Sequence, residues 1–199
     1  MPDLPSYSAM MTEMEAVNLI LRSCGIAPLT TNMALDETPD GAKAHGELMD
    51  TARNVLSSGW NFNRNINVKL APNVDGHVLL PANTLKVDTI CTDYGKPLIQ
   101  RGAKLYDREA NSFVIGKEII VEIYVMLAWE EIPQVARNYI AVVAARRATG
   151  GKIITSGEAW QFTREDELKA LTLLEQHDSD IEDFDSYNVN PHFAKMGRR

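Results

Sequence analysis

Cysteine is scarce in this 199-residue chain, and no apolar run is long enough to cross a bilayer. The two cysteines, Cys24 and Cys91, lie far apart in different predicted elements, which argues against a disulfide framework and a clustered metal site. The opening residues also lack the basic segment and apolar core of a secretory signal. We therefore expect a protein that is made in a cytoplasm and has no membrane span.

Positive charge is also in deficit. The chain has 20 Lys and Arg against 27 Asp and Glu, a formal net charge of -7. An acidic protein does not attract phosphates over its whole surface, so a sequence-independent nucleic-acid binder is disfavoured, although a local basic patch stays open. A hydrophobic fraction of 45% is ordinary for a soluble chain of this length, which can bury a sizeable core.

The phosphate-binding loop of nucleotide hydrolases is missing. Gly151–Lys152 offers its Gly-Lys pair, but the loop needs a Gly six residues before the Lys, and Arg146 stands there. The position after the Lys, which needs a hydroxyl for magnesium, holds Ile153. The two glycines that follow the predicted helix are typical of a helix stop.

A calcium loop is matched only in its first positions. Asp178, Asp180 and Glu182 have the spacing of the first three ligands, but the sixth position holds Asp183 instead of Gly and the twelfth holds Val189 instead of Glu. The stretch is better explained as a solvated acidic segment.

The chain also shows no pattern of catalytic residues. Glu130 and Glu131 are neighbours at a helix start, and 165–167 is an acidic run on the polar side of the last helix, so both are typical of helix electrostatics. The histidines have no ligand spacing, and no Ser or Cys sits in a nucleophile motif. We expect no catalytic residue, no metal and no cofactor, and favour a structural or docking protein.

The chain is organised around residues 42–70. Apolar residues spaced three and four apart, among them Leu48, predict a helix that Gly59 ends. From Trp60 the apolar residues alternate with Asn, which predicts a strand whose Asn row faces outward. Trp60 and Phe62 are predicted to anchor a core shared by helices and sheet.

Four helices are predicted. The first is marked by Thr12 and Glu15, which have the spacing of a capping box. The last has Trp160, Leu168 and Leu174 on its apolar side, and Trp160 is expected in the core. Their predicted bounds are Thr12–Cys24, Ala42–Ser58, Pro133–Thr149 and Glu158–His177.

Residues 60–127 predict a β region of five to seven short antiparallel strands, because β-branched runs alternate with turn signals. Short spacing favours hairpins. Residues 118–127 (EIIVEIYVML) are expected to form the most buried strand.

The end of the chain, residues 178–199, is first acidic and then basic, with interleaved aromatic residues. Exposed aromatics are unfavourable unless a partner covers them, so the segment is interpreted as a peptide that orders on a partner, with a disordered tail as the alternative.

The predicted class is therefore α+β: a four-helix bundle with an inserted antiparallel β domain and an extended C-terminal docking arm. The expected parts are 1–59, N-terminal helices; 60–127, β domain; 128–177, C-terminal helices; and 178–199, C-terminal extension.

Four stretches together resemble a known family: AVNLILRSCGIAPLTT, NVLSSGWNFN, RGAKLYDRE, and EEIPQVARNYIAVVAARRATGG followed by an acidic last helix. In this order and spacing they are similar to tail tubular protein A, the head-to-tail adaptor of short-tailed, podovirus-type bacteriophages. The similarity runs from about Glu13 to Tyr187, while the last residues, NPHFAKMGRR, match nothing in the family pattern.

The resemblance implies a virion protein of the tail that closes into a dodecameric ring between the portal protein and the tail nozzle, tail tubular protein B. Double-stranded DNA would pass through the lumen without specific binding, during packaging retention and ejection. The helices would pack around the ring, and the β region would face neighbouring subunits and the nozzle. The C-terminal segment would dock on the portal through Phe184, Tyr187, His192 and Phe193.

Two alternatives stay open. One is a phage-tail glycan hydrolase acting on the host envelope, which would need two opposed carboxylates across a cleft, one with a raised pKa. The other is a soluble scaffold of similar architecture that forms no ring.

Overall fold

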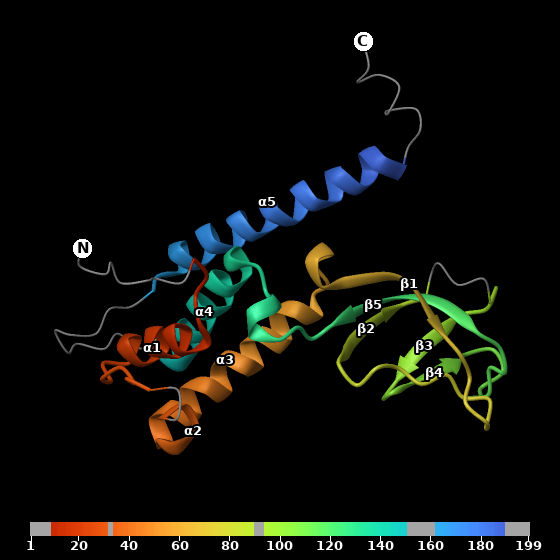
Figure 1. Ribbon diagram of the computed structural model, residues 1–199, viewed down its shortest axis with the longest axis horizontal. Helices are drawn as coiled ribbons and strands as arrows, with labels where there is room; N and C mark the ends of the chain where they lie inside the picture. The colour runs from red at the N-terminus through yellow and green to blue at the C-terminus, as the bar shows by residue number, and fades with distance from the viewer. Residues whose placement is uncertain (1–8, 32–33, 90–93, 151–161, 190–199) are drawn as a thin grey trace, which may run out of the picture. The chain divides into compact units, whose positions relative to one another are not determined.

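The computed structural model describes residues 9–31, 34–89, 94–150 and 162–189. The chain forms two compact units, labelled by element in Figure 1. The helical unit comprises residues 1–52 and 128–199, and the β unit comprises residues 53–127. The division falls inside one helix, which begins in the helical unit and ends in the β unit. The protein is thus of mixed α and β structure with antiparallel sheets, as predicted, while a closed four-helix bundle stays a prediction.

The helical unit is built around α4, which packs against α1 on one side and α5 on another. Its core is formed by small and branched side chains, with Ala16, Leu48, Ile140 and Leu174 among those fully buried. The described helices are α1 (Glu13–Ser23), α2 (Ala34–Glu37), α3 (Pro39–Ser57), the 3-10 turn η2 (Trp129–Glu131), α4 (Gln134–Ala148) and α5 (Arg164–Val189).

Helix α1 begins where the sequence predicts. The Thr12 hydroxyl accepts a hydrogen bond from the Glu15 amide at 3.2 Å, and the Glu15 carboxylate accepts one from the Thr12 amide at 2.7 Å. This capping box satisfies two amides that have no partner inside the helix. The predicted capping box is therefore confirmed.

Helix α5 differs from its prediction in its faces and its end. Leu174 is fully buried, but Leu168 is 52% exposed, so the expectation that both share one buried side is wrong. Six residues at roughly 100° each place the two side chains about 120° apart around the helix. The helix also continues to Val189, past the predicted end at His177. Its predicted start, Glu158, lies outside the described residues.

The β unit contains a three-stranded sheet with the order β1-β5-β2 and a separate β3–β4 hairpin, all antiparallel. Among the described strands, β3 and β4 alone form the kind of hairpin that short spacing favours, while β1 and β2 pair with β5, which is distant in sequence. The strand predicted as most buried is β5, which is the central strand of the three-stranded sheet. Its side chains alternate strictly between buried and half-buried. The strands are β1 (Arg64–Leu70), β2 (Thr84–Asp88), β3 (Leu98–Arg101), β4 (Lys104–Asp107) and β5 (Ile119–Val125).

The core of the β unit is continuous across both sheets. The hairpin contributes Leu98 and Leu105, which lie on one side of it, and the central strand contributes four β-branched residues. The buried members of this core are Val78, Leu80, Leu98, Leu105, Ile115, Ile119, Val121, Ile123 and Val125.

The joint after α3 corrects the sequence prediction of a strand from Trp60. Residues Asn61–Asn63 form a 3-10 turn, and β1 begins only at Arg64. The Asn63 side chain is 1% exposed instead of facing outward, since its amide nitrogen donates to the carbonyls of Leu56 and Val125, each at 3.0 Å. It thereby satisfies a carbonyl at the end of α3 that the helix itself leaves unbonded.

The alternation in β1 is also interrupted. The pairing register with β5 shifts between Asn65 and Val68, and Asn67 has a φ of 56°, in the left-handed region that Asn tolerates better than most residues. The bulge turns Ile66 outward, where it is 58% exposed. The alternation from Trp60 predicts that the apolar residues, Ile66 among them, face inward, and for Ile66 this prediction is wrong.

Candidate assembly surfaces

The described residues offer surfaces for assembly rather than an obvious reaction centre. Within them, no three His, Cys, Asp or Glu side chains come together in a way that would hold a metal ion. No helix in the described part of the chain is long and apolar enough to cross a membrane.

The predicted core residues occupy different environments. Leu48 is fully buried on α3. Trp60 and Phe62 are half-buried in the β unit, with their rings stacked 6.4 Å apart at an interplanar angle of 12°. The Trp60 indole nitrogen donates to the Val55 carbonyl at 2.8 Å, so this ring also provides a hydrogen-bond donor to the last turn of α3. Trp160 lies outside the described residues.

The predicted portal-docking residues lie at the margin of the structure. The backbone of α5 includes Phe184 and Tyr187, whose side chains are outside the description, and His192 and Phe193 follow the last described residue. Their proposed role stays a prediction.

The described part of α5 has an exposed face that its own unit does not cover. We call Glu165, Leu168, Thr172 and Glu175 the outer face of α5; all four are exposed, and their spacing places them on one side of the helix. Leu168 lines a shallow groove with Thr172 and with Leu173, which is 53% exposed. Exposed leucines beside carboxylates are typical of a surface that a partner covers.

Beyond Leu174 the helix loses its support. Leu174 is the last buried residue among the α5 side chains that the structure describes, and those from Glu175 to Ile181 are exposed or half-buried. The charged residues of the stretch after Leu174 are all acidic, and the last turn of the helix contains no basic residue. Carboxylates near the negative end of a helix dipole are unfavourable. A partner with positive charge would relieve this repulsion.

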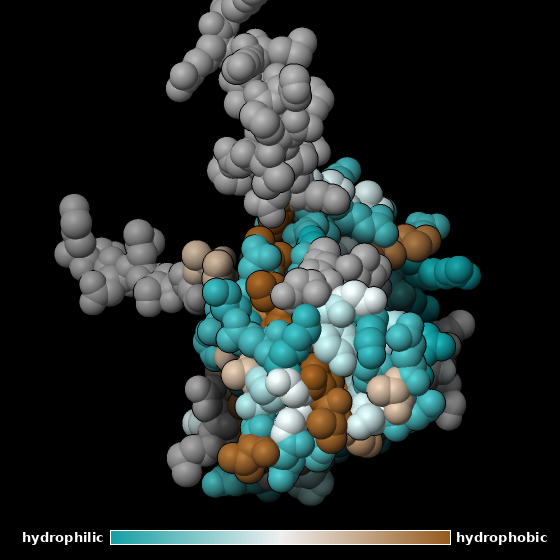
Figure 2. Space-filling view, turned by 90° about the vertical axis from the view of Figure 1, so that its right-hand side faces the viewer, coloured by the Kyte–Doolittle hydropathy of each residue, from teal (hydrophilic) through white to brown (hydrophobic). Residues whose placement is uncertain are grey.

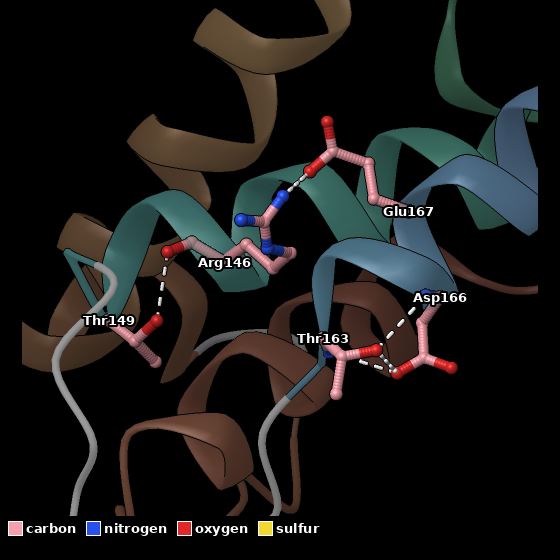
Figure 3. Close-up of polar contacts among 5 residues, drawn as sticks. All are labelled: Arg146, Thr149, Thr163, Asp166 and Glu167. Atoms are coloured by element: carbon pink, nitrogen blue, oxygen red, sulfur yellow. Dashed lines mark hydrogen bonds and ion pairs between the residues drawn. The ribbon is translucent and has the colours of Figure 1, made fainter.

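A small polar cluster holds the start of α5 beside the end of α4 (Figure 3). Arg146 in the last turn of α4 forms an ion pair with Glu167 in the first turn of α5. The Thr163 hydroxyl accepts from the Asp166 amide at 3.1 Å, while the Asp166 carboxylate accepts from the Thr163 amide at 2.9 Å. This reciprocal cap starts α5 at Arg164 and, with the ion pair, fixes where the outer face lies within the helical unit.

A second polar cluster ties the N-terminal segment to α4. The Arg137 guanidinium, 4% exposed, donates to the carbonyls of Ile132 at 2.7 Å, Met11 at 2.8 Å and Glu130 at 2.6 Å. The Trp129 indole nitrogen also donates to the Met11 carbonyl, at 3.0 Å. A buried guanidinium with three carbonyl partners positions a chain segment, because a buried charge is stable only where its donors are bonded.

The β3–β4 hairpin presents two cations side by side. Arg101 and Lys104 are direct partners in the antiparallel pairing, so their side chains project from the same face of the hairpin. The Arg101 guanidinium lies 3.6 Å from the centre of the Tyr106 ring, and the Lys104 ammonium lies 5.8 Å from that of Phe113. The described residues offer neither cation a carboxylate partner.

Rings fix the geometry of these cations. Tyr106 and Phe113 meet edge to face with centroids 5.0 Å apart, and Phe113 also contacts His77. The Lys104 ammonium lies within hydrogen-bond distance of His77 Nδ1, at 3.2 Å. We call Arg101, Lys104, His77, Tyr106 and Phe113 the cationic face.

The acidity of the chain is unevenly divided between its units. In residues 53–127 the sequence has nine Lys and Arg and seven Asp and Glu, a net charge of +2, so the remaining residues carry -9 of the total of -7. Figure 2 shows a face on which hydrophilic residues predominate and hydrophobic ones form a narrow band. Exposed apolar side chains of the β unit include Leu79, which pairs with Lys104, and Val114, which pairs with His77.

Asp107 organises the turn that follows β4. Its carboxylate is fully buried and accepts hydrogen bonds from the amides of Glu109 at 2.8 Å and Ala110 at 2.9 Å, and from the Tyr94 hydroxyl at 3.0 Å. These bonds, first the one from the Ala110 amide, hold the pKa of Asp107 below its usual value despite burial. Burial and the bond to Asp107 raise the pKa of Tyr94.

The carboxylates with displaced pKa values are built into turns and caps. The pKa of Asp166 is lowered, first by the Thr163 amide and then by the Thr163 hydroxyl. The shift at Asp107 has the same sign, opposite to the raised pKa that a glycosidase acid requires. Nothing in the described residues favours glycan hydrolysis.

Three of these organising residues were missed by sequence reasoning. Asn63 was assigned to the outward-facing Asn row. It lies instead in the 3-10 turn before β1, and the alternation of apolar and Asn residues runs through this turn without a visible break. Arg137 is a charge within a helix that is otherwise apolar or small nearly all round, which is a usable sign of a buried, multiply bonded arginine. Asp107 ends β4 directly before a turn, a position where Asp side chains often bond to later amides.

Comparison with known proteins adds the decisive observation. A family model described as tail tubular protein matches residues 14–184. The chain belongs to the tail tubular protein family. The match covers both units and reaches into the second half of α5. No curated protein matches the chain.

Membership establishes a structural role in the tail of a bacteriophage particle. As a tail tubular protein, the chain is a virion component whose partners are other proteins of the tail assembly. This is the class of function expected from the absence of catalytic motifs and from the resemblance of the four sequence stretches.

Proposed function

We propose that this protein is the adaptor that joins the portal to the tail nozzle, as a closed, dodecameric ring through which the genome passes. The observation that carries the proposal is the family match over residues 14–184, which coincides with the stretch that resembles head-to-tail adaptors. Identical subunits that contact each other through two different surfaces close into rings when the rotation between them permits. Each contact need only be moderate, because many act together.

The proposed docking arm comprises Asp178–Arg199, with Phe184, Tyr187, His192 and Phe193 as contacts to the portal. Its support is that the α5 side chains from Glu175 to Ile181 are exposed or half-buried, together with the acidic end of this helix. Isolated helical stretches of this length are marginal in water, so a surface that covers them adds most of their stability. The nozzle, tail tubular protein B, is the proposed partner on the opposite side of the ring.

The charge of the chain suits a conduit. An acidic subunit repels phosphates, so DNA would move through the lumen without being held. Retention of the packaged genome and its ejection would then depend on neighbouring tail proteins, with the adaptor as the connection.

A truncation after His177 tests the arm. We expect the truncated protein to stay folded, since no described side chain after Leu174 is buried, and to lose co-sedimentation with purified portal rings. Loss of the far-UV helical signal and of cooperative unfolding would instead assign the arm to the core. Portal binding that survives the truncation would contradict the docking role.

A further inference from the structure

The cationic face contains an arrangement that is unfavourable in an isolated subunit. Arg101 and Lys104 stand directly opposite each other on β3 and β4, and like charges in this position destabilise a strand pair. No carboxylate among the described residues compensates them. Both are nevertheless held in place by the rings of Tyr106 and Phe113. Such preorganised cations are suited to an anionic partner.

The chain itself carries a surface of the opposite kind. The outer face of α5 combines the carboxylates of Glu165 and Glu175 with the exposed Leu168. The cationic face is likewise bordered by the exposed apolar side chains of Leu79 and Val114. Each surface thus offers exposed apolar side chains beside charged ones, with cations on the hairpin and the carboxylates of Glu165 and Glu175 on α5, so that pairs of opposite charge can form.

We propose that the cationic face of one subunit docks on the outer face of α5 of a second copy of this chain. The contact joins two different surfaces and is therefore heterologous, which is the kind that builds rings. It rests on the proposed ring and adds the pair of surfaces that meet within it. The proposed portal arm begins only at Asp178, so both contacts can be made by one subunit.

A polypeptide partner is favoured over nucleic acid for two reasons. The whole chain is acidic, with a net charge of -7, so a duplex is repelled at long range. The apolar side chains of Leu79 and Val114 beside the cations match a helix with exposed leucines better than a phosphate backbone.

Two exposed basic residues, Arg164 and Lys169, lie beside the first turn of the outer face. Lys169 lies four residues after Glu165, in the orientation that favours an ion pair along a helix, and its charge also lowers the pKa of Asp166. No Lys or Arg lies within one turn of Glu175 on α5, so the acidic character of the outer face is strongest at that end.

The test uses two full-length charge-reversal variants. Variant A carries Arg101→Glu and Lys104→Glu, and variant B carries Glu165→Lys and Glu175→Lys. In either variant alone the facing surfaces repel, so we expect assembly into rings on portal to require at least about tenfold more protein than for the wild type, read by mass photometry. An equimolar mixture of A and B restores attraction at both kinds of contact, as alternating subunits, and should recover assembly at the wild-type concentration.

A matched control separates this effect from general charge. The control carries Lys69→Glu and Arg108→Glu, which change the net charge of the β unit by the same amount as variant A does, at exposed positions outside the cationic face. It should assemble as the wild type does. Circular dichroism and urea unfolding of each variant verify the fold.

Four outcomes would overturn the inference. Assembly of variant A or B at the wild-type concentration would show that these surfaces do not meet. Failure of the mixture, with rescue only when all four substitutions are in one chain, would place the contact within a subunit. Loss of duplex DNA binding by variant A, without a change in assembly, would assign the cationic face to nucleic acid. Equal loss in the control would make the effect one of net charge. Absence of assembly by the wild type would instead refute the proposed ring itself.

Discussion

Replacing Asn63 by Ala tests the account of the joint between α3 and β1. The Asn63 side chain makes three hydrogen bonds, two of them buried: to the carbonyls of Leu56 and Val125, each at 3.0 Å, and from the Trp60 amide at 2.9 Å. Each is worth about 1 kcal/mol net. The Leu56 carbonyl keeps a bond from the Gly59 amide at 3.2 Å, whereas the Trp60 amide loses its side-chain acceptor. We therefore expect the substitution to lower the free energy of unfolding of the β unit by about 3 kcal/mol.

Urea unfolding followed by the fluorescence of Trp60, with the other two tryptophans replaced by Phe in every variant, measures this loss. With a slope of about 2 kcal/mol per molar urea, the midpoint should fall by about 1.5 M. Asn63→Asp keeps the acceptor for Trp60 but turns a carboxylate toward two carbonyls, so it should be at least as destabilising.

Asn65→Ala is the matched control, because it removes the same amide from an exposed position of β1. Its effect should stay within about 0.5 kcal/mol. A midpoint for Asn63→Ala that equals the control's would refute the reasoning that this side chain connects helix and sheet.

Two further predictions concern the polar clusters. Asp107→Asn should destabilise the β unit at neutral pH, because the pKa of Asp107 is lowered in the folded state. The ionised carboxylate therefore stabilises the fold fully above its unfolded pKa of about 4, and this stabilisation is lost as the pH falls from there through the lower pKa of the folded state. The urea midpoints of wild type and variant should converge on acidification, whereas the exposed Asp75→Asn should show no such dependence. Arg137→Met should cost about 2 kcal/mol, since the carbonyls of Ile132 and Glu130 lose their guanidinium donor while that of Met11 keeps Trp129. The loosened segment should also exchange the Met11 amide, which donates to the Gln134 side chain, faster than in the wild type; unchanged exchange at Met11 would contradict the role of Arg137 in positioning this segment.

The sequence predicted features that depend on local chemistry. The Thr12 and Glu15 capping box follows from spacing alone, because both partners lie within one turn. The bounds of α1, α3 and α4 were also placed within three residues, because capping, proline and glycine signals lie at their ends, whereas α5 ends twelve residues later than predicted. Family membership followed from four ordered stretches, none of which is diagnostic alone.

Features that depend on distant partners were not predictable in this way. The pairing of β5 with both β1 and β2 joins segments far apart in sequence, and no local signal specifies it. Leu168 has the hydropathy of a core residue but faces outward, because burial on α5 is decided by what packs on it. The cationic face requires the register of β3 with β4, which places Arg101 opposite Lys104.

The central claim is that this tail tubular protein forms an adaptor ring on the portal. The most direct measurement is the particle mass, by mass photometry, of purified portal rings mixed with the full-length protein. The account predicts a discrete increase equal to one complete ring of 22.2 kDa subunits. Portal particles of unchanged mass beside free monomer would contradict it.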